Sequence, residues 1–144
     1  MSESPTPAGR SARLNTGVAH NARVWNYWIG GKDNYEVDQQ VGEHVANMFP
    51  IIREIARADR WFLGRAVRYL AEERGVRQFL DVGTGLPTAD NTHQIAQRIA
   101  PDARIVYVDN DPIVLAHART LLTGTREGVT DYIDADVNEP AALL

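Results

Sequence analysis

The sequence predicts an α/β fold in which a helical cap precedes a parallel sheet, and two observations carry this prediction. Apolar residues recur at helical spacing between residues 19 and 75. From residue 76 on, short β-branched runs alternate with helical stretches in the order strand–helix–strand–helix–strand. This alternation is typical of parallel strands joined by right-handed crossovers, so we expect one sheet with helices packed on it.

Three helices are expected in the cap, each ended by a residue that favours turns. Asn34 is the expected N-terminal cap of the second helix, because its side chain can accept a hydrogen bond from a free backbone N–H. Asp59 is expected to interrupt the third helix and to cap its second half. The expected helices are 19–29, 35–47 and 51–74, with stops at Gly30-Gly31, Pro50 and Gly75.

The alternating part of the chain begins with a short apolar run that is followed by glycines, as in a buried strand. Asp111 precedes a proline, which is a favoured start for a helix because proline lacks the N–H that would otherwise be free. The expected strands are 77–82, 104–109 and 130–135, and the expected crossover helices are 88–100 and 112–121.

Composition narrows the class of protein. The chain has 144 residues, of which 44% are hydrophobic and 24% charged, as in an ordinary globular domain. It has no cysteine, which excludes disulfides, zinc–thiolate sites and a thiol nucleophile. A net charge of −4 makes nucleic acid an unlikely partner. We find no membrane span and no secretory signal in residues 1–13, and we expect a cytoplasmic protein without a metal site.

A ligand loop is expected where the first strand ends, in the run LDVGTG at residues 80–85. Gly83 and Gly85 have no Cβ, so the backbone there can come close to a ligand. Asp109 ends the second strand, where a carboxylate can accept both hydroxyls of a ribose, and Asp136 follows the third, where it can accept from an adenine amino group. Ligands of such sheets bind beyond the carboxyl ends of the strands, so these acids predict a nucleoside site.

The charge pattern favours S-adenosylmethionine (SAM) over a dinucleotide. The dinucleotide pattern needs a third glycine, and Thr88 occupies that position. Asp81 lies two residues before the first glycine, where its carboxylate would repel a pyrophosphate but attract the ammonium and sulfonium groups of SAM. We therefore expect SAM as the cofactor.

The motifs resemble those of class I SAM-dependent methyltransferases, in segment 79–85, at Asp109 and at residues 135–136. A narrower resemblance, to the bacterial S-adenosyl methyltransferase family, covers about residues 20–144. It rests on IGGKDNY at 29–35, RWFLGRAV at 60–67, QFLDVGTGLPT at 78–88 and VYVDNDP at 106–112. The resemblance implies a Rossmann-like sheet and transfer of a methyl group from SAM.

Ten residues are expected to bind the cofactor. Besides the loop and strand-end residues, Asn110 is expected under or beside the adenine. The 30–35 segment has two possible roles: it closes over the cofactor as a lid, through Lys32, Asp33 and Tyr35, or it is a tight turn. Catalytic residues are unknown, since no histidine or glutamate is marked as a general base. The expected cofactor-binding residues are Asp81, Gly83, Thr84, Gly85, Asp109, Asn110, Asp136, Val137, Lys32 and Tyr35.

The expected organisation is a flexible tail at 1–18, a helical cap at 19–75 and a SAM-binding Rossmann-like half-domain at 76–144. Members of the family that the chain resembles are about twice as long, and further strands follow. In the expected strand order 3-2-1-4-5, the first strand is an open edge when only three strands are present. We therefore expect a fragment of a longer enzyme, or association with another chain along that apolar edge.

The predicted function is methyl transfer from SAM to an unknown acceptor, most simply a small molecule. The alternatives are a non-catalytic SAM- or nucleoside-binding module, an NAD-dependent oxidoreductase and, less favoured, a structural or RNA-binding protein. An assay of methyl transfer to a panel of acceptors separates a methyltransferase from the first alternative, a non-catalytic binding module. Nicotinamide binding that tolerates Asp81→Asn marks the second, and strongly salt-dependent RNA binding marks the third.

Overall fold

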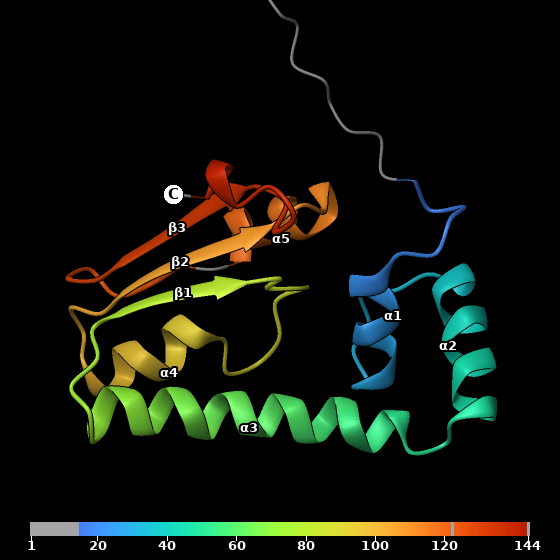
Figure 1. Cartoon of the computed structure of the whole chain (residues 1–144), viewed down its shortest axis with the longest axis horizontal. Helices are drawn as coiled ribbons and strands as arrows, with labels where there is room; N and C mark the ends of the chain where they lie inside the picture. Colours follow the sequence, from blue (N-terminus) through green and yellow to red (C-terminus); the bar gives the residue numbers. More distant parts are fainter. Residues whose placement is uncertain (1–14, 122, 144) are drawn as a thin grey trace, which may run out of the picture.

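A computed structural model of the chain describes residues 15–121 and 123–143. Helices and a parallel sheet form two groups, with the sheet and its helices at one end and the first two helices at the other (Figure 1). The strands point toward this second group, so their carboxyl ends face α1. The elements are α1 (Asn21–Trp28), α2 (Glu36–Met48), α3 (Ile52–Glu72), β1 (Gln78–Val82), α4 (Thr92–Ile99), β2 (Arg104–Asp109), α5 (Pro112–Leu121), β3 (Val129–Asp134) and the 3₁₀ helix η1 (Pro140–Ala142).

The three strands form a parallel sheet in the order β1-β2-β3. Leu80 pairs with Val106, and Asp109 pairs with Asp134, so the strands end at nearly the same level. This order confirms the expected arrangement, in which β2 lies between the other two strands and β1 is an edge. The ends of the strands therefore form one rim, from which ligand-binding residues can act together.

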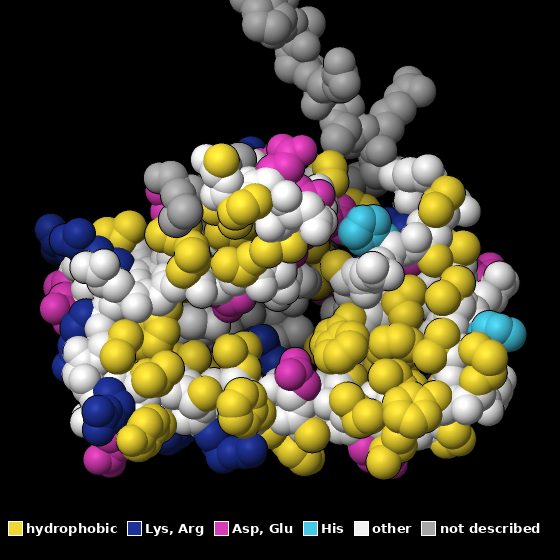
Figure 2. Space-filling view, in the orientation of Figure 1, with side chains coloured by type: hydrophobic (Ala, Val, Ile, Leu, Met, Phe, Trp, Pro, Cys, Tyr) yellow, Lys and Arg dark blue, Asp and Glu magenta, His cyan; other side chains and the backbone are white. Residues whose placement is uncertain are grey.

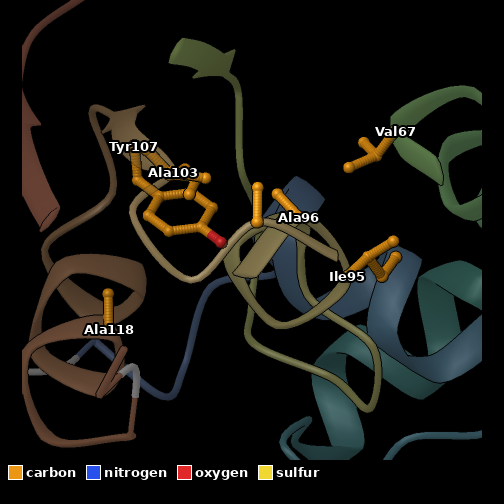
Figure 3. Packing of buried hydrophobic residues seen from close by; sticks show 8 residues of the cluster. Val67, Ile95, Ala96, Ala103, Tyr107 and Ala118 are labelled. Atoms are coloured by element: carbon orange, nitrogen blue, oxygen red, sulfur yellow. The ribbon is translucent and has the colours of Figure 1, made fainter. Parts of the chain in front are cut away.

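One face of the sheet carries the core. Both crossovers step in the same direction, and right-handed crossovers then place their helices on the same face. Ile105 and Tyr107 of β2 accordingly pack in one cluster with Ile95 of α4 and Ala118 of α5. Val67 of α3 packs against this cluster from the far side of α4 (Figure 3). The sheet, α4 and α3 thus form successive layers.

The opposite face of the sheet is open over β1. Leu80 is 56% exposed and Val82 is 42% exposed, although both belong to an apolar strand. Hydrophobic side chains are visible along the sheet in Figure 2. A parallel sheet normally has helices on both faces, and here apolar side chains of β1 stay exposed because α4 and α5 share a face.

A buried ion pair joins the two cap helices. Nε of Arg23 in α1 lies 2.9 Å from Oδ2 of Asp38 in α2, and both side chains are almost fully buried. Asp38 also accepts hydrogen bonds from the backbone N–H groups of His20 and Tyr35. The carboxylate therefore satisfies the ends of two helices as well as the guanidinium, which fixes α1 against α2.

The 30–35 segment wraps around the buried side chain of Asn26. Oδ1 of Asn26 accepts from the backbone N–H of Asp33 and from Nδ2 of Asn34. A Cβ on Gly31 would lie 2.3 Å from Nδ2 of Asn26, so only glycine fits there. Gly30 has φ +85°, a conformation that favours glycine. The glycine pair thus shapes a tight turn between α1 and α2.

Three helix boundaries differ from expectation. Tyr35, rather than Asn34, is the N-cap of α2, because Asp38 supplies the reciprocal hydrogen bond of a capping box. Asp59 does not interrupt α3, which is continuous because the residue lies on an exposed side of the helix. The helix expected from Thr88 begins four residues later, after the cap Asn91.

The expected flexible tail falls mostly on residues 1–14, which lie outside the described residues. Residues 15–18 form a turn, and the backbone oxygens of Asn15 and Val18 accept hydrogen bonds from Arg23. Within the described part of the chain, no helix has the length and apolar character needed to cross a membrane.

Candidate cofactor site

A cavity of about 650 Å³ lies between the strand ends and α1, where the molecule is hollowed in Figure 2. Its size is within the range of about 300–1,000 Å³ that is typical of small-molecule sites. One wall comes from the ends of β1 and β2, and the other from α1 and the middle of α3. The lining residues are His20, Asn21, Ala22, Trp25, Asn26, Ile29, Asp59, Arg60, Phe62, Leu63, Ala66, Asp81, Gly83, Thr84, Gly85, Leu86, Thr88, Asp109 and Asn110.

The strand wall contains the glycine loop, whose conformation requires glycine. Gly83 has φ +74° and Gly85 has φ +68°, values that other residues rarely adopt. A Cβ on either glycine would meet nothing within 4 Å, so it is the backbone conformation, and not lack of space, that requires glycine in this structure. The side chain of Thr84 donates to the backbone oxygen of Asp81, which holds the turn closed.

Every N–H group of this loop is already bonded within the protein. The backbone N–H groups of Gly83 and Thr84 donate to the oxygen of Val108, at 2.9 and 3.3 Å. The N–H of Gly85 donates to Oδ2 of Asp109, at 2.9 Å. A phosphate-binding loop needs free N–H groups that point at the anion. The loop therefore does not offer a pyrophosphate site.

Asp109 is held at the centre of the strand wall. Its Oδ1 accepts from the backbone N–H of Asp111, at 2.9 Å, and its Oδ2 accepts from Gly85. A carboxylate has about four acceptor positions, so each oxygen retains one for a ligand hydroxyl. This arrangement fits a ribose, whose two neighbouring hydroxyls can each donate to one carboxylate oxygen.

Asp81 supplies a second carboxylate to the same wall. Its Oδ2 accepts from Oγ1 of Thr92 in the first turn of α4, at 2.6 Å, which fixes the orientation of the side chain. Among the described residues, no hydrogen bond to Oδ1 is found, so this oxygen is available to a donor in the cavity. The strand wall thus presents two carboxylates and no free N–H group of the loop. Such a wall favours a ligand that carries hydrogen-bond donors and positive charge.

The helical wall brings residues that sequence reasoning did not assign to a site. Nδ1 of His20 lies 2.9 Å from Oδ2 of Asp111, which is 2% exposed and caps α5 through the N–H of Ile113. The hydrogen bond from Ile113 confirms that Asp111 caps α5, and the contact with His20 ties the start of α1 to the strand wall. The helix α1 then runs along the cavity, and the flanking residues His20 and Ile29 also line it. No spacing in the sequence could have placed α1 there, because the contact joins residues that are far apart in the chain.

Arg60 of α3 is the second unassigned residue in the helical wall. Its Nη2 donates to the backbone oxygens of Ala89 and Asp90, at 3.3 and 3.0 Å, and to Oδ1 of Asn91, at 3.3 Å. Burial lowers the pKa of Arg60 from its ordinary value, and the negative charge of Asp81 opposes this effect. Arg60 is thus a partly buried cation that lines the same cavity as Asp81.

The structure brings most of the expected cofactor residues together. Six of the ten line the cavity, and a seventh, Asp136, is joined to one of them by a hydrogen bond from Nδ2 of Asn110, at 3.3 Å. Asp136 also accepts from the backbone and side chain of Asn138, and these hydrogen bonds lower its pKa. Lys32, Tyr35 and Val137 do not line the cavity, and their role in cofactor binding stays a prediction. The six residues that line it are Asp81, Gly83, Thr84, Gly85, Asp109 and Asn110.

The fold and this wall define a class: a Rossmann-like α/β protein whose strand ends hold acids suited to a nucleoside with a cationic tail. Comparison with known families agrees with that class. The model of the S-adenosyl methyltransferase family matches residues 7–144, so the chain belongs to this family, and SAM is its cofactor. The resemblance found in the sequence and the expected cofactor are both confirmed.

Two solved structures resemble the chain. A DUF574 family protein from Streptomyces avermitilis is 50% identical, with a TM-score of 0.87 over 91% of this chain and 50% of that one. A protein from Thermobifida fusca that has been proposed to be a methyltransferase is 45% identical, with a TM-score of 0.80 over 88% of this chain and 47% of that one. The chain therefore spans about half the length of these relatives. Among curated proteins, the chain has no significant match.

Proposed function

We propose that this chain is the cofactor-binding part of an enzyme that transfers a methyl group from SAM to a small-molecule acceptor. The observation that carries the proposal is the composition of the strand wall. Asp81 and Asp109 present carboxylates to one cavity, while the N–H groups of the glycine loop are all bonded within the protein. Membership of the S-adenosyl methyltransferase family supports the same ligand.

Each group in the wall would contribute to holding the donor. Asp109 would accept from the ribose hydroxyls, Asn110 would lie beside the adenine, and Asp81 would accept from the ammonium of the amino-acid end. SAM supplies an activated methyl group: its carbon–sulfur bond breaks with the electron pair left on sulfur, and the acceptor forms the new bond to carbon and loses a proton. The protein would contribute mainly by positioning the reactants and by electrostatics.

Binding measurements on the chain test the ligand class. Calorimetry should show S-adenosylhomocysteine binding to the wild-type chain and little binding of NAD. Binding of NAD without binding of S-adenosylhomocysteine would overturn the proposal and favour an oxidoreductase, which would also tolerate Asp81→Asn.

A transfer assay tests the reaction. Methyl-labelled SAM is incubated with small molecules that present hydroxyl, amine or thiol groups, and labelled product is measured alongside release of S-adenosylhomocysteine. Product that depends on both enzyme and acceptor supports the proposal. Cofactor binding without any transfer, in this chain and in its full-length relatives, would overturn it in favour of a non-catalytic SAM-binding module.

We also propose that the protein acts in a bacterial cytoplasm.

We propose further that residues 1–144 are either part of a longer enzyme or associate with another chain through the open edge of the sheet. The support for association is the exposure of Leu80 and Val82 on β1, an edge strand with unpaired backbone groups. Light scattering should then show a species larger than the monomer. A charged substitution such as Leu80→Lys should restore the monomer, and a wild-type chain that is monomeric at all concentrations would contradict association.

A further inference from the structure

We infer that Arg60 binds the carboxylate at the amino-acid end of the cofactor, opposite the ammonium that Asp81 accepts. The inference rests on the proposed function and deepens it, because it assigns the end of the ligand that distinguishes SAM from other adenine nucleosides. The geometry that points to it is a guanidinium and a carboxylate that line one cavity, each held in place by hydrogen bonds to other residues.

Arg60 is the only lysine or arginine among the residues that line the cavity. The other charged lining residues are acids or the histidine that pairs with Asp111. Without Arg60, an amino-acid carboxylate in this cavity would meet three acids, and the histidine there is already in contact with Asp111; the acids are Asp59, Asp81 and Asp109. Such like charges repel at close range, so one cation is needed for the ligand's carboxylate to be accepted.

The loop before α4 holds Arg60 in place while leaving part of its guanidinium available. The three hydrogen bonds to residues 89–91 all come from Nη2. A guanidinium has five N–H donors in a planar fork, and three of them belong to Nε and Nη1. No hydrogen bond from these two nitrogens to a described residue is found. The free edge of the fork can therefore meet a carboxylate through two parallel bonds.

The presence of both Asp81 and Arg60 in the lining explains why the ligand would be a zwitterion. Thr92 fixes the carboxylate of Asp81, and the 89–91 loop fixes the guanidinium of Arg60, so the cavity offers one negative and one positive group. An amino-acid group carries an ammonium and a carboxylate on one carbon atom. It can therefore place each charge against its opposite, whereas a neutral nucleoside gains from neither.

Arginine also has a structural role here, because it joins α3 to the loop that precedes α4. Removal of the side chain could therefore disturb the cavity without any loss of a ligand contact. A test must compare two ligands that share the nucleoside and differ in the amino-acid end. S-adenosylhomocysteine and 5′-methylthioadenosine form such a pair, since the second lacks both the ammonium and the carboxylate.

The experiment is calorimetry with both ligands on the wild-type chain, on Arg60→Gln and on Arg60→Lys. Arg68→Gln is the matched control, because Arg68 is an exposed arginine on the same helix. We expect Arg60→Gln to weaken S-adenosylhomocysteine binding by roughly 10–150-fold, as for loss of a charged hydrogen bond. The affinity for 5′-methylthioadenosine should change less than about twofold, and Arg60→Lys should retain part of the discrimination because it keeps the charge.

Each outcome has one meaning. Equal losses for both ligands in Arg60→Gln would show that Arg60 only positions the 89–91 loop, and would overturn the inference. A wild-type chain that binds the two ligands equally would also overturn it, while the proposed function would stand. A wild-type chain that binds neither ligand would be a failure of the proposed function itself.

Discussion

The two walls of the cavity are built in different ways. The strand wall consists of residues that are close in the chain or paired in the sheet, and backbone hydrogen bonds fix it, as between Gly83 and Val108. The helical wall is assembled from α1 and α3 by contacts between distant residues, such as the pair His20–Asp111. The strand wall can therefore be recognised from a motif, whereas the helical wall depends on tertiary packing. Substitutions in the two walls should have separable effects.

The largest expected effect is on the helical wall, through the buried pair of Arg23 and Asp38. Asp38→Asn leaves the guanidinium buried without its counter-charge, and we expect the free energy of unfolding to fall by about 3–5 kcal/mol. Urea denaturation followed by circular dichroism measures this loss. The matched control is Glu36→Gln, an exposed acid in the first turn of the same helix, for which the change should stay below about 1 kcal/mol. Similar losses in both variants would show that the ion pair does not hold the cap.

The next effect belongs to the strand wall and concerns binding. Asp109→Ala should lower the affinity for S-adenosylhomocysteine by about 1.5–3 kcal/mol, because it removes a charged acceptor for the ribose and the partner of the Gly85 N–H. Calorimetry on Asp134→Ala provides the control, since Asp134 ends the neighbouring strand in register with Asp109 but does not line the cavity. Unchanged affinity in Asp109→Ala would end the assignment of Asp109 to the ribose.

A smaller effect separates conformation from space in the glycine loop. Gly85→Ala should destabilise the fold by about 1–2 kcal/mol, because φ +68° is a left-handed conformation that alanine adopts with strain. Gly85→Asn should lose less, since asparagine tolerates this region, although its side chain is larger. Thermal unfolding of the two variants measures the difference. A greater loss for asparagine would mean that crowding, rather than φ, requires glycine.

The smallest expected effect is in the 30–35 turn. If Lys32 and Tyr35 close over the cofactor, the amide groups of this segment should exchange more slowly when S-adenosylhomocysteine is bound. Hydrogen exchange measured with and without the ligand tests this, and the amides of α2 beyond its first turn serve as an internal reference. Equal exchange in the two states would leave the segment as a turn around Asn26.

The sequence was sufficient to predict the sheet and the strand wall because both follow local rules. The β2 limits agree residue for residue, and Asp109 lies beside the glycine loop as the parallel-strand rule requires. Local rules were weaker at helix starts. Asn91 caps α4 because Gln94 completes a capping box, while Thr88 offered an equally suitable side chain three residues earlier.

The helical wall could not be predicted for a physical reason. Arg60 belongs to a helix with four other arginines, and nothing in the sequence distinguishes it from them. Its place in the cavity that Asp81 also lines depends on how α3 packs against α4, through contacts such as Val67 with Ile95. The contact of His20 with Asp111 likewise depends on the packing of α1, which the pair of Arg23 and Asp38 joins to α2.

One measurement tests the central claim, that the cavity binds a nucleoside with a cationic amino-acid tail. Calorimetry of the wild-type chain is carried out with S-adenosylhomocysteine and with NAD, at the same protein concentration and ionic strength. The structure predicts saturable binding of S-adenosylhomocysteine and no measurable heat with NAD, because the loop N–H groups are bonded and Asp81 repels phosphate. Tighter binding of NAD than of S-adenosylhomocysteine would contradict the account.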